Sequence, residues 1–181
     1  MTSRIARTLL KWVALIGVVT ALAGAALSCG SFTPSEAPDF TLPTMIGTNV
    51  TLSALNGTPV VINFWYIGCR YCREELPYFE DVAMKSSEIT VLTVNPVDSN
   101  STLLSFFNSY DPAMTVALDS KAGTYVDYSQ RFGNSRMVVP FTLLVDSEGI
   151  VQYAKIGAFG SAGDLWNTLH KVLGITVPAT P

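Results

Sequence analysis

The sequence predicts an α/β domain in which strands and helices alternate along the chain and build a mixed central sheet. Residues 60–65 and 89–94 are near-continuous apolar runs, as expected of strands that are buried on both faces. Segments of helical periodicity follow each of them, and this alternation produces parallel strand pairs with right-handed crossovers. Residues 141–145 and 150–155 are joined by a turn that ends in Gly149, which indicates a closing antiparallel hairpin. We therefore expect helices on both faces of the sheet.

The predicted elements follow one another in a regular order. Short strands at 40–42 and 50–52, with a turn between them, predict an N-terminal β-hairpin. Behind it we expect strand 60–65, helix 71–84, strand 89–94, helix 102–108, strand 114–118, helix 125–132, strands 141–145 and 150–155, and helix 162–173. Ser161 and Asp164 predict a capping box at the start of the last helix, and Gly174 predicts its end.

Composition sets limits on the class of protein. The chain has 181 residues, of which 49% are hydrophobic and 14% charged, so it can bury the core of one domain and is not expected to be disordered. Residues 29–181 carry 8 basic and 14 acidic side chains, whereas residues 1–28 carry 3 basic and no acidic ones. An acidic body without a basic run argues against nucleic acid as a partner.

The first residues have the layout of a secretory signal. Residues 1–11 are positively charged, residues 12–27 are an apolar run, and small residues precede Cys29. The segment resembles a bacterial lipoprotein signal, in which cleavage leaves the cysteine as a lipidated N-terminus. The alternative is an uncleaved anchor, because counting on through Phe32 gives about 21 residues, enough to cross the hydrocarbon core. We favour the lipoprotein, and both alternatives place the body outside the cytoplasm at a bacterial membrane.

The remaining chain is expected to consist of a tether, one domain and a tail. Residues 30–37 are rich in Ser, Pro and Gly and predict a flexible tether. The domain is expected over residues 38–175, and residues 176–181 are expected to form a loose tail.

Cys69 and Cys72 are the only cysteines of the predicted body, and they follow a buried strand at the start of a helix. Residues three apart on a helix are neighbours, so the two sulfurs can bridge. Cys69 is expected at the helix N-terminus, where the helix dipole and the positive charge of Arg70 favour a thiolate. Cys72 lies one turn further in and should be less exposed. We therefore expect Cys69 to attack and Cys72 to resolve.

Three other uses of this pair are less favoured. A static disulfide across so short a loop would hardly restrict the unfolded chain. A zinc site needs two more ligands, and the body offers only His170, a predicted surface residue, beyond the two cysteines. A haem attachment site needs a histidine after the second cysteine, where Arg73 stands. No metal or other cofactor is expected.

The run VVINFWYIGCRYCREELP at residues 60–77 resembles the active-site segment of the thioredoxin superfamily. It is most similar to the TlpA/ResA branch of membrane-anchored thiol–disulfide oxidoreductases, whose redoxin domain is related to AhpC/TSA. The resemblance covers about residues 37–173, including APDFTL and TLSALNG near the start and VVPFTLLVDSEGIV at 138–151. It implies a thioredoxin-like fold with an N-terminal β-hairpin, and an enzyme that exchanges protein thiols and disulfides.

The resemblance also implies roles for individual residues. It makes Cys69 the nucleophile and Cys72 the resolving thiol. Pro140 matches the cis-proline that faces the disulfide, and Val139 matches the residue whose backbone pairs with an extended substrate chain. Pro77 matches the proline that kinks the active-site helix.

Two polar positions near the pair carry further expectations. Asn63 stands where classical thioredoxins have a buried acid, and the TlpA/ResA branch commonly has Asn there. Glu75 matches that branch's acidic residue three positions after the second cysteine. The same spacing places Glu75 on the helix face of Cys72, where a carboxylate can exchange protons with the resolving thiol. Glu74 is expected to point elsewhere.

The sequence departs from the family pattern at the positions that tune the redox pair. Gly68 precedes Cys69 where the family often has Trp, and Arg70-Tyr71 is not a common pair between the cysteines. The positive charge of Arg70 should stabilise the Cys69 thiolate, which would make the Cys69–Cys72 couple more oxidising. The branch resemblance instead implies a reductase, often of apocytochrome c, that exchanges electrons with a membrane partner. We expect the reductase, on the resemblance.

Two other functions remain as alternatives. A copper carrier similar to the Sco family would have three residues between its cysteines and a distant histidine, whereas two residues intervene here and His170 is badly placed. A peroxiredoxin-type thiol peroxidase typically has Thr three residues before the attacking cysteine, where this chain has Tyr66.

Overall fold

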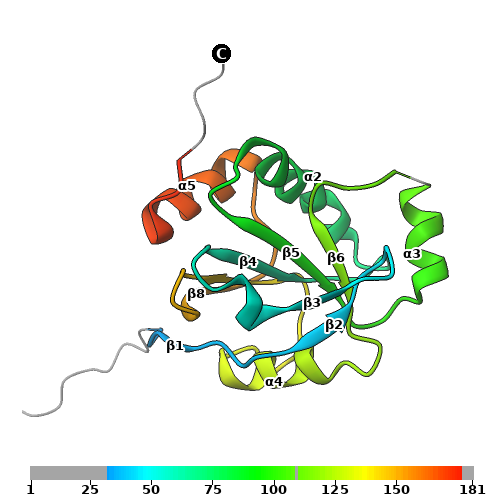
Figure 1. The fold of residues 1–181 in the computed structure, drawn as a ribbon, viewed down its shortest axis with the longest axis horizontal. Helices are drawn as coiled ribbons and strands as arrows, with labels where there is room; N and C mark the ends of the chain where they lie inside the picture. The colour runs from blue at the N-terminus through cyan, green and yellow to red at the C-terminus, as the bar shows by residue number, and fades with distance from the viewer. Residues whose placement is uncertain (1–31, 109, 177–181) are drawn as a thin grey trace, which may run out of the picture. The chain divides into compact units, whose positions relative to one another are not determined.

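The computed structural model describes residues 32–108 and 110–176 (Figure 1). The predicted signal segment with Cys29 lies outside these residues, as does nearly all of the predicted tail. Within the described part of the chain, no helix is both long and apolar enough to cross a membrane.

Six strands form one mixed sheet in the order β1-β8-β7-β4-β5-β6. They are β1 (Ser35–Glu36), β4 (Val60–Phe64), β5 (Thr90–Asn95), β6 (Thr115–Leu118), β7 (Phe141–Val145) and β8 (Ile150–Ile156). The three strands β4, β5 and β6 run parallel, while β7 is antiparallel to both β4 and β8. The expected α/β class with a mixed central sheet is confirmed.

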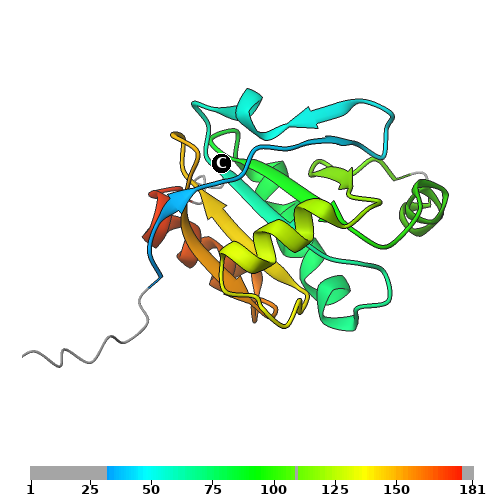
Figure 2. The ribbon, with the colours of Figure 1, turned by 90° about the horizontal axis from the view of Figure 1, so that it is seen from below.

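Helices cover both faces of the sheet, as expected (Figures 1 and 2). The α-helices of residues 32–108 and 110–176 are α2 (Arg70–Lys85), α3 (Asn100–Phe107), α4 (Gly123–Arg131) and α5 (Ala162–Leu173). The pleat of β4 divides the core, because Val61 packs with the buried side chains of α2 and α5. Ile62 and Phe64 pack on the opposite face, with Tyr125 and Tyr128 of α4. Alternate residues of a strand thus supply two separate apolar cores.

The N-terminal hairpin consists of β2 (Thr41–Pro43) and β3 (Asn49–Thr51) and leads into the short 3-10 helix η1 (Leu52–Leu55). It forms a separate two-stranded sheet. The Met45 N–H donates to the Val116 carbonyl at 2.8 Å, which joins the hairpin turn to the edge strand β6. Leu42 and Leu52 add their side chains to the core on the α4 face.

One predicted boundary needs correction. Residues 30–37 were expected to be a tether, but Ser35 and Glu36 form β1 and pair antiparallel with Val151 and Ile150 of β8. Ala37 is buried, so the folded domain begins before residue 38. Polar residues without a strand pattern can pair here because β8 would otherwise be an open sheet edge. The other element boundaries lie within about two residues of their predicted positions, the usual scatter of helix ends.

Candidate active site

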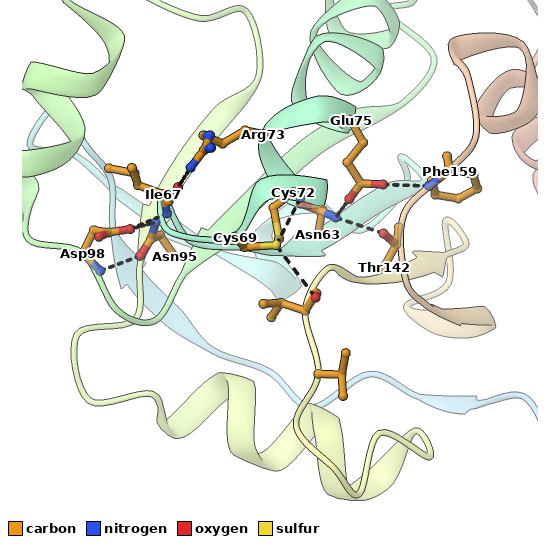
Figure 3. The surroundings of a disulfide bond; sticks show 12 residues. Asn63, Ile67, Cys69, Cys72, Arg73, Glu75, Asn95, Asp98, Thr142 and Phe159 are labelled. Carbon is orange, nitrogen blue, oxygen red and sulfur yellow. Dashed lines mark hydrogen bonds between the residues drawn. A yellow bond between two sulfur atoms is a disulfide. The ribbon is translucent and has the colours of Figure 1, made fainter.

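The redox pair lies where the central strand β4 leads into α2 (Figure 3). Cys69 is the N-cap residue of α2, and its Sγ accepts a hydrogen bond from the Cys72 N–H at 3.1 Å. The two cysteines form a disulfide with their Cα atoms 5.3 Å apart. The expected strand-then-helix placement is confirmed. The helix N-terminus directs unpaired N–H groups at Cys69, which is the arrangement that stabilises a thiolate.

The two cysteines differ in exposure as whole residues. Cys69 keeps 9% of its surface, whereas Cys72 is fully buried at 0%. Cys69 is therefore the cysteine nearer to solvent, and the order in which the two sulfurs react stays a prediction.

A loop in front of β7 faces the disulfide. The Val139–Pro140 peptide bond is cis, which confirms the prediction for Pro140. The Val139 carbonyl oxygen lies 3.9 Å from Cys69 Sγ. Asn134, which the sequence analysis did not single out, shapes this loop, because its buried side chain donates to the Val138 carbonyl at 2.8 Å and accepts from the Val138 N–H at 2.9 Å. A lone asparagine before a proline loop carries no pattern that would have marked it.

A buried polar cluster lies behind Cys72 (Figure 3). Glu75 is fully buried on α2, and its carboxylate accepts from the Asn63 side chain at 3.0 Å and from the Phe159 N–H at 2.9 Å. The Asn63 amide also donates to Thr142 Oγ1 at 3.0 Å, which connects β4 to β7. The sequence predicts Asn63 and Glu75 as separate site residues. Thr142 and the Phe159 backbone are remote in the chain and carry no pattern that marks them.

Burial changes the proton affinity of Glu75. Loss of solvation raises the pKa of this carboxyl from 4.5 to about 7, although the Phe159 and Asn63 hydrogen bonds and the positive charge of Lys155 lower it in part. A carboxyl with this pKa changes its charge state near neutral pH, so it can both take and return a proton. It lies one helical turn from Cys72. These properties suit proton exchange with the resolving thiol.

The exposed residues between the cysteines form the outer face of the site. Arg70 Nε pairs with Glu74 Oε1 at 2.8 Å, and the two side chains are 77% and 50% exposed. The positive charge that was expected to act on Cys69 is thus shared with a carboxylate and surrounded by water. Tyr71 is 63% exposed beside the disulfide. A Cβ on Gly68 would lie 2.8 Å from the Tyr66 ring, so Tyr66 fills the space that a larger residue would need.

The segment between β4 and Cys69 is held by residues that sequence reasoning missed. The Ile67 N–H donates to Asp98 Oδ2 at 2.8 Å, and Arg73 Nη1 donates to the Ile67 carbonyl oxygen. His170, the only histidine of the chain, is exposed on α5. Within residues 32–108 and 110–176, no three side chains of His, Cys, Asp or Glu are grouped to hold a metal ion.

The fold and the buried dithiol site define a thioredoxin-like thiol–disulfide oxidoreductase. The chain belongs to the AhpC/TSA family, whose model matches residues 34–154.

The chain is similar to several named proteins and to solved structures. The chain is 30% identical over 126 residues to the thioredoxin-like protein YneN of Bacillus subtilis, covering 67% of this chain and 70% of that protein. It is 31% identical over 119 residues to the thiol–disulfide oxidoreductase ResA of Bacillus subtilis, covering 65% and 63%. Among solved structures it resembles a putative thiol:disulfide interchange protein DsbE from Chlorobium tepidum. That match has a TM-score of 0.67 and 27% identity, over 80% of this chain and all of that one.

We predict that Glu75 makes the stability of the oxidised protein depend on pH. Its folded-state pKa of about 7 lies above the ordinary 4.5, so the folded protein binds more protons than the unfolded chain between these values. Stability should therefore fall by about 3 kcal/mol as pH rises through this window. Urea unfolding from about pH 4.5 to about pH 8 should show this slope in the wild type and not in Glu75→Gln. Glu74→Gln, which changes the exposed neighbour, should keep it. An unchanged slope in Glu75→Gln would contradict the role assigned to burial.

Proposed function

We propose that this chain uses the Cys69–Cys72 dithiol to reduce disulfide bonds of protein substrates outside the cytoplasm. The observation that carries the proposal is the unequal exposure of the two cysteine residues, together with a buried carboxyl one turn behind the inner cysteine. A reductase of protein disulfides needs one thiol that a large partner can reach and a second that only the mixed disulfide can meet.

The reaction begins with the Cys69 thiolate, which attacks one sulfur of the substrate disulfide. The substrate S–S bond breaks, a Cys69–substrate disulfide forms, and the first substrate thiolate leaves and takes a proton from solvent. Cys72 then passes its thiol proton to the Glu75 carboxylate and attacks Cys69 Sγ. The second substrate thiolate leaves, and the Cys69–Cys72 disulfide forms. Two electrons have passed from the enzyme dithiol to the substrate disulfide.

The cis-proline loop is proposed to hold the substrate chain during this exchange. The Val139 carbonyl oxygen lies 3.9 Å from Cys69 Sγ, so a chain whose cysteine bonds to Cys69 passes directly beside that backbone. An extended segment can pair there as an added strand, with Pro140 setting the direction of the loop. Tyr71, which lies between the two cysteines and is exposed, offers an apolar contact to the same partner.

Two considerations support the reducing direction. The resemblance to ResA-type proteins implies that the protein reduces its substrates. The main argument for oxidation is the positive charge of Arg70, and the surroundings of Arg70 weaken that argument. Arg70 would make the couple more oxidising by stabilising the thiolate, but Glu74 shares its charge in an exposed ion pair. Apocytochrome c before haem attachment is one candidate substrate. The oxidised pair would then be reduced again by a dithiol donor in the membrane.

The location rests on the N-terminal residues. We propose that residues 1–29 direct export and that Cys29 carries a lipid that holds the domain at the outer face of the membrane. The charge pattern of residues 1–28, with three basic and no acidic side chains, supports this orientation.

Mixed disulfides should accumulate on Cys69 when the resolving thiol is removed. We expect Cys72→Ser, expressed in the exporting cell and treated with acid and alkylating agent, to appear in non-reducing gels as bands that reducing agent collapses. Cys69→Ser should give none, because Cys72 is buried. Equal bands from both variants would contradict the order of attack, and bands from neither would contradict exchange with proteins.

The reduction potential of the Cys69–Cys72 couple determines whether the protein reduces or oxidises its substrates. We expect the Cys69–Cys72 couple to lie nearer to about −270 mV, typical of thioredoxin, than to about −120 mV, typical of a strong oxidant. Equilibration with reduced and oxidised glutathione, followed by alkylation and mass analysis, measures it. A potential near about −120 mV would contradict the reductase and would indicate a protein that donates disulfide bonds.

Lipid attachment should depend on a single side chain. Cys29→Ala should abolish incorporation of a labelled fatty acid and leave residues 1–28 attached, whereas Ser28→Ala should keep the label and the cleavage. A wild-type chain that takes up no label and keeps residues 1–28 would indicate the uncleaved anchor instead.

A further inference from the structure

The peptide groups of Ile67, two residues before Cys69, are bound by side chains of opposite charge (Figure 3). The Ile67 N–H donates to Asp98 Oδ2 at 2.8 Å. The Ile67 carbonyl oxygen accepts from Arg73 Nη1 on α2. Both are charge-assisted hydrogen bonds, which are about twice as strong as neutral ones. One backbone residue of the active-site loop is thus held by an acid and a base that come from different elements.

Asp98 is itself held in place. It lies between the end of β5 and Ser99, the N-cap of α3. The fully buried Asn95 donates its side-chain amide to Asp98 Oδ2 at 2.9 Å. The Asn95 side-chain oxygen accepts from the Asp98 N–H at 2.7 Å, so the backbone and the carboxylate of Asp98 are both bonded to one buried amide. The carboxylate is presented to Ile67 in a fixed position.

The sheet topology brings these groups together. Strands β4 and β5 are parallel, with Phe64 beside Val94, so the segments that follow them leave the same edge of the sheet. The Trp65 N–H donates to the Val94 carbonyl at 3.1 Å and continues this pairing beyond the strand. The Asp98 segment therefore lies beside the segment that leads to Cys69. The Cys69 N–H in turn donates to the Tyr66 carbonyl at 3.1 Å, which makes the loop one bonded unit.

The two charges act on the thiolate in opposite directions. The Cys69–Cys72 disulfide is neutral, whereas reduction at neutral pH creates a negative charge on Cys69. A carboxylate near the loop opposes that charge and a guanidinium supports it. A more stable thiolate favours the reduced pair and raises the reduction potential.

We propose that Asp98 and Arg73 are positioning residues that fix the Ile67 peptide ahead of Cys69, and that their opposite charges balance the reduction potential of the Cys69–Cys72 pair. The inference rests on thiol–disulfide exchange by this pair and holds for either direction of the proposed function. Arg73, rather than Arg70, is then the cation that supports the thiolate, because Arg73 is bonded to the loop and Arg70 is paired with Glu74.

Variants that remove one charge test the electrostatic part. Asp98→Asn keeps an acceptor for Ile67, whereas Arg73→Met loses the hydrogen bond to Ile67 together with the charge. Asp98→Asn keeps an oxygen that accepts from Ile67 and Asn95 but removes the charge, so the equilibrium with glutathione should shift about threefold toward the dithiol, or about 14 mV upward. Arg73→Met should shift it about threefold the other way, and Arg73→Lys should remain near the wild type. Both shifts should shrink as salt is added. Shifts of the same sign, or none, would overturn this part of the proposal.

A second comparison tests the positioning part. Asp98→Ala removes the hydrogen bonds as well as the charge. The pH dependence of alkylation gives the fraction of Cys69 present as thiolate in each variant. When rates are compared at equal thiolate fractions, Cys69 should attack a small aromatic disulfide more slowly in Asp98→Ala than in Asp98→Asn. Equal rates would show that the carboxylate acts by charge alone and would overturn the positioning role.

Matched controls come from α4, on the other face of the sheet. Asp127 pairs with Arg131 there at 2.7 Å. Asp127→Asn and Arg131→Met make the same changes of net charge and should leave the potential unchanged. If they shift it as much as the Asp98 and Arg73 variants do, the local assignment is wrong. Because a small disulfide and glutathione are the probes, these outcomes do not depend on whether protein substrates are ever trapped.

Discussion

The redox centre depends on the hydrogen bonding of β4, the strand that lies between β5 and β7. Its end leads to Cys69. Because β7 is antiparallel to it, with Phe64 beside Phe141, the loop that precedes β7 meets the loop that follows β4, and Val139 faces Cys69. Because β5 is parallel to it, the segment after β5 reaches the same edge and brings Asp98 to Ile67. Two strand pairings of opposite direction thus assemble three remote segments around one sulfur atom.

The site has an inner half that is shielded from solvent and an outer half that is exposed to it. The inner half holds Cys72, Glu75 and Asn63, all without exposure to solvent. A carboxyl there is costly to ionise, which raises the pKa of Glu75 to about 7 and makes it useful for moving a proton at neutral pH. The outer half holds Arg70 and Tyr71, whose side chains are exposed to solvent. Water is excluded from the inner half, whereas the outer side chains can change without disturbing the core.

The charges around Cys69 differ in how firmly they are held rather than in burial, because Arg73 is exposed and Asp98 is half-buried. An exposed pair such as Arg70 and Glu74 is solvated, so its effect on a neighbouring sulfur is small. Arg73 and Asp98 instead bond to the backbone of the loop itself, and Asp98 is anchored by a buried amide. A charge that is fixed relative to the thiolate influences it more consistently than one on a mobile side chain. The nearest arginine in sequence is for this reason not the one that we assign to the redox pair.

The sequence by itself determined the alternation of strands and helices and the place of Cys69 and Cys72 at a helix start, because these are local patterns of period and spacing. The cis-proline at Pro140 was implied by the resemblance to the thioredoxin superfamily. The sequence also placed Glu75 on the helix face of Cys72. Only the tertiary structure decided that Thr142, the Phe159 N–H and Asp98 complete the site, and that Ser35 and Glu36 form a strand. The physical reason is that periodicity shows which face a side chain occupies, whereas the residue opposite it depends on strand order and register, which are set by the whole chain at once.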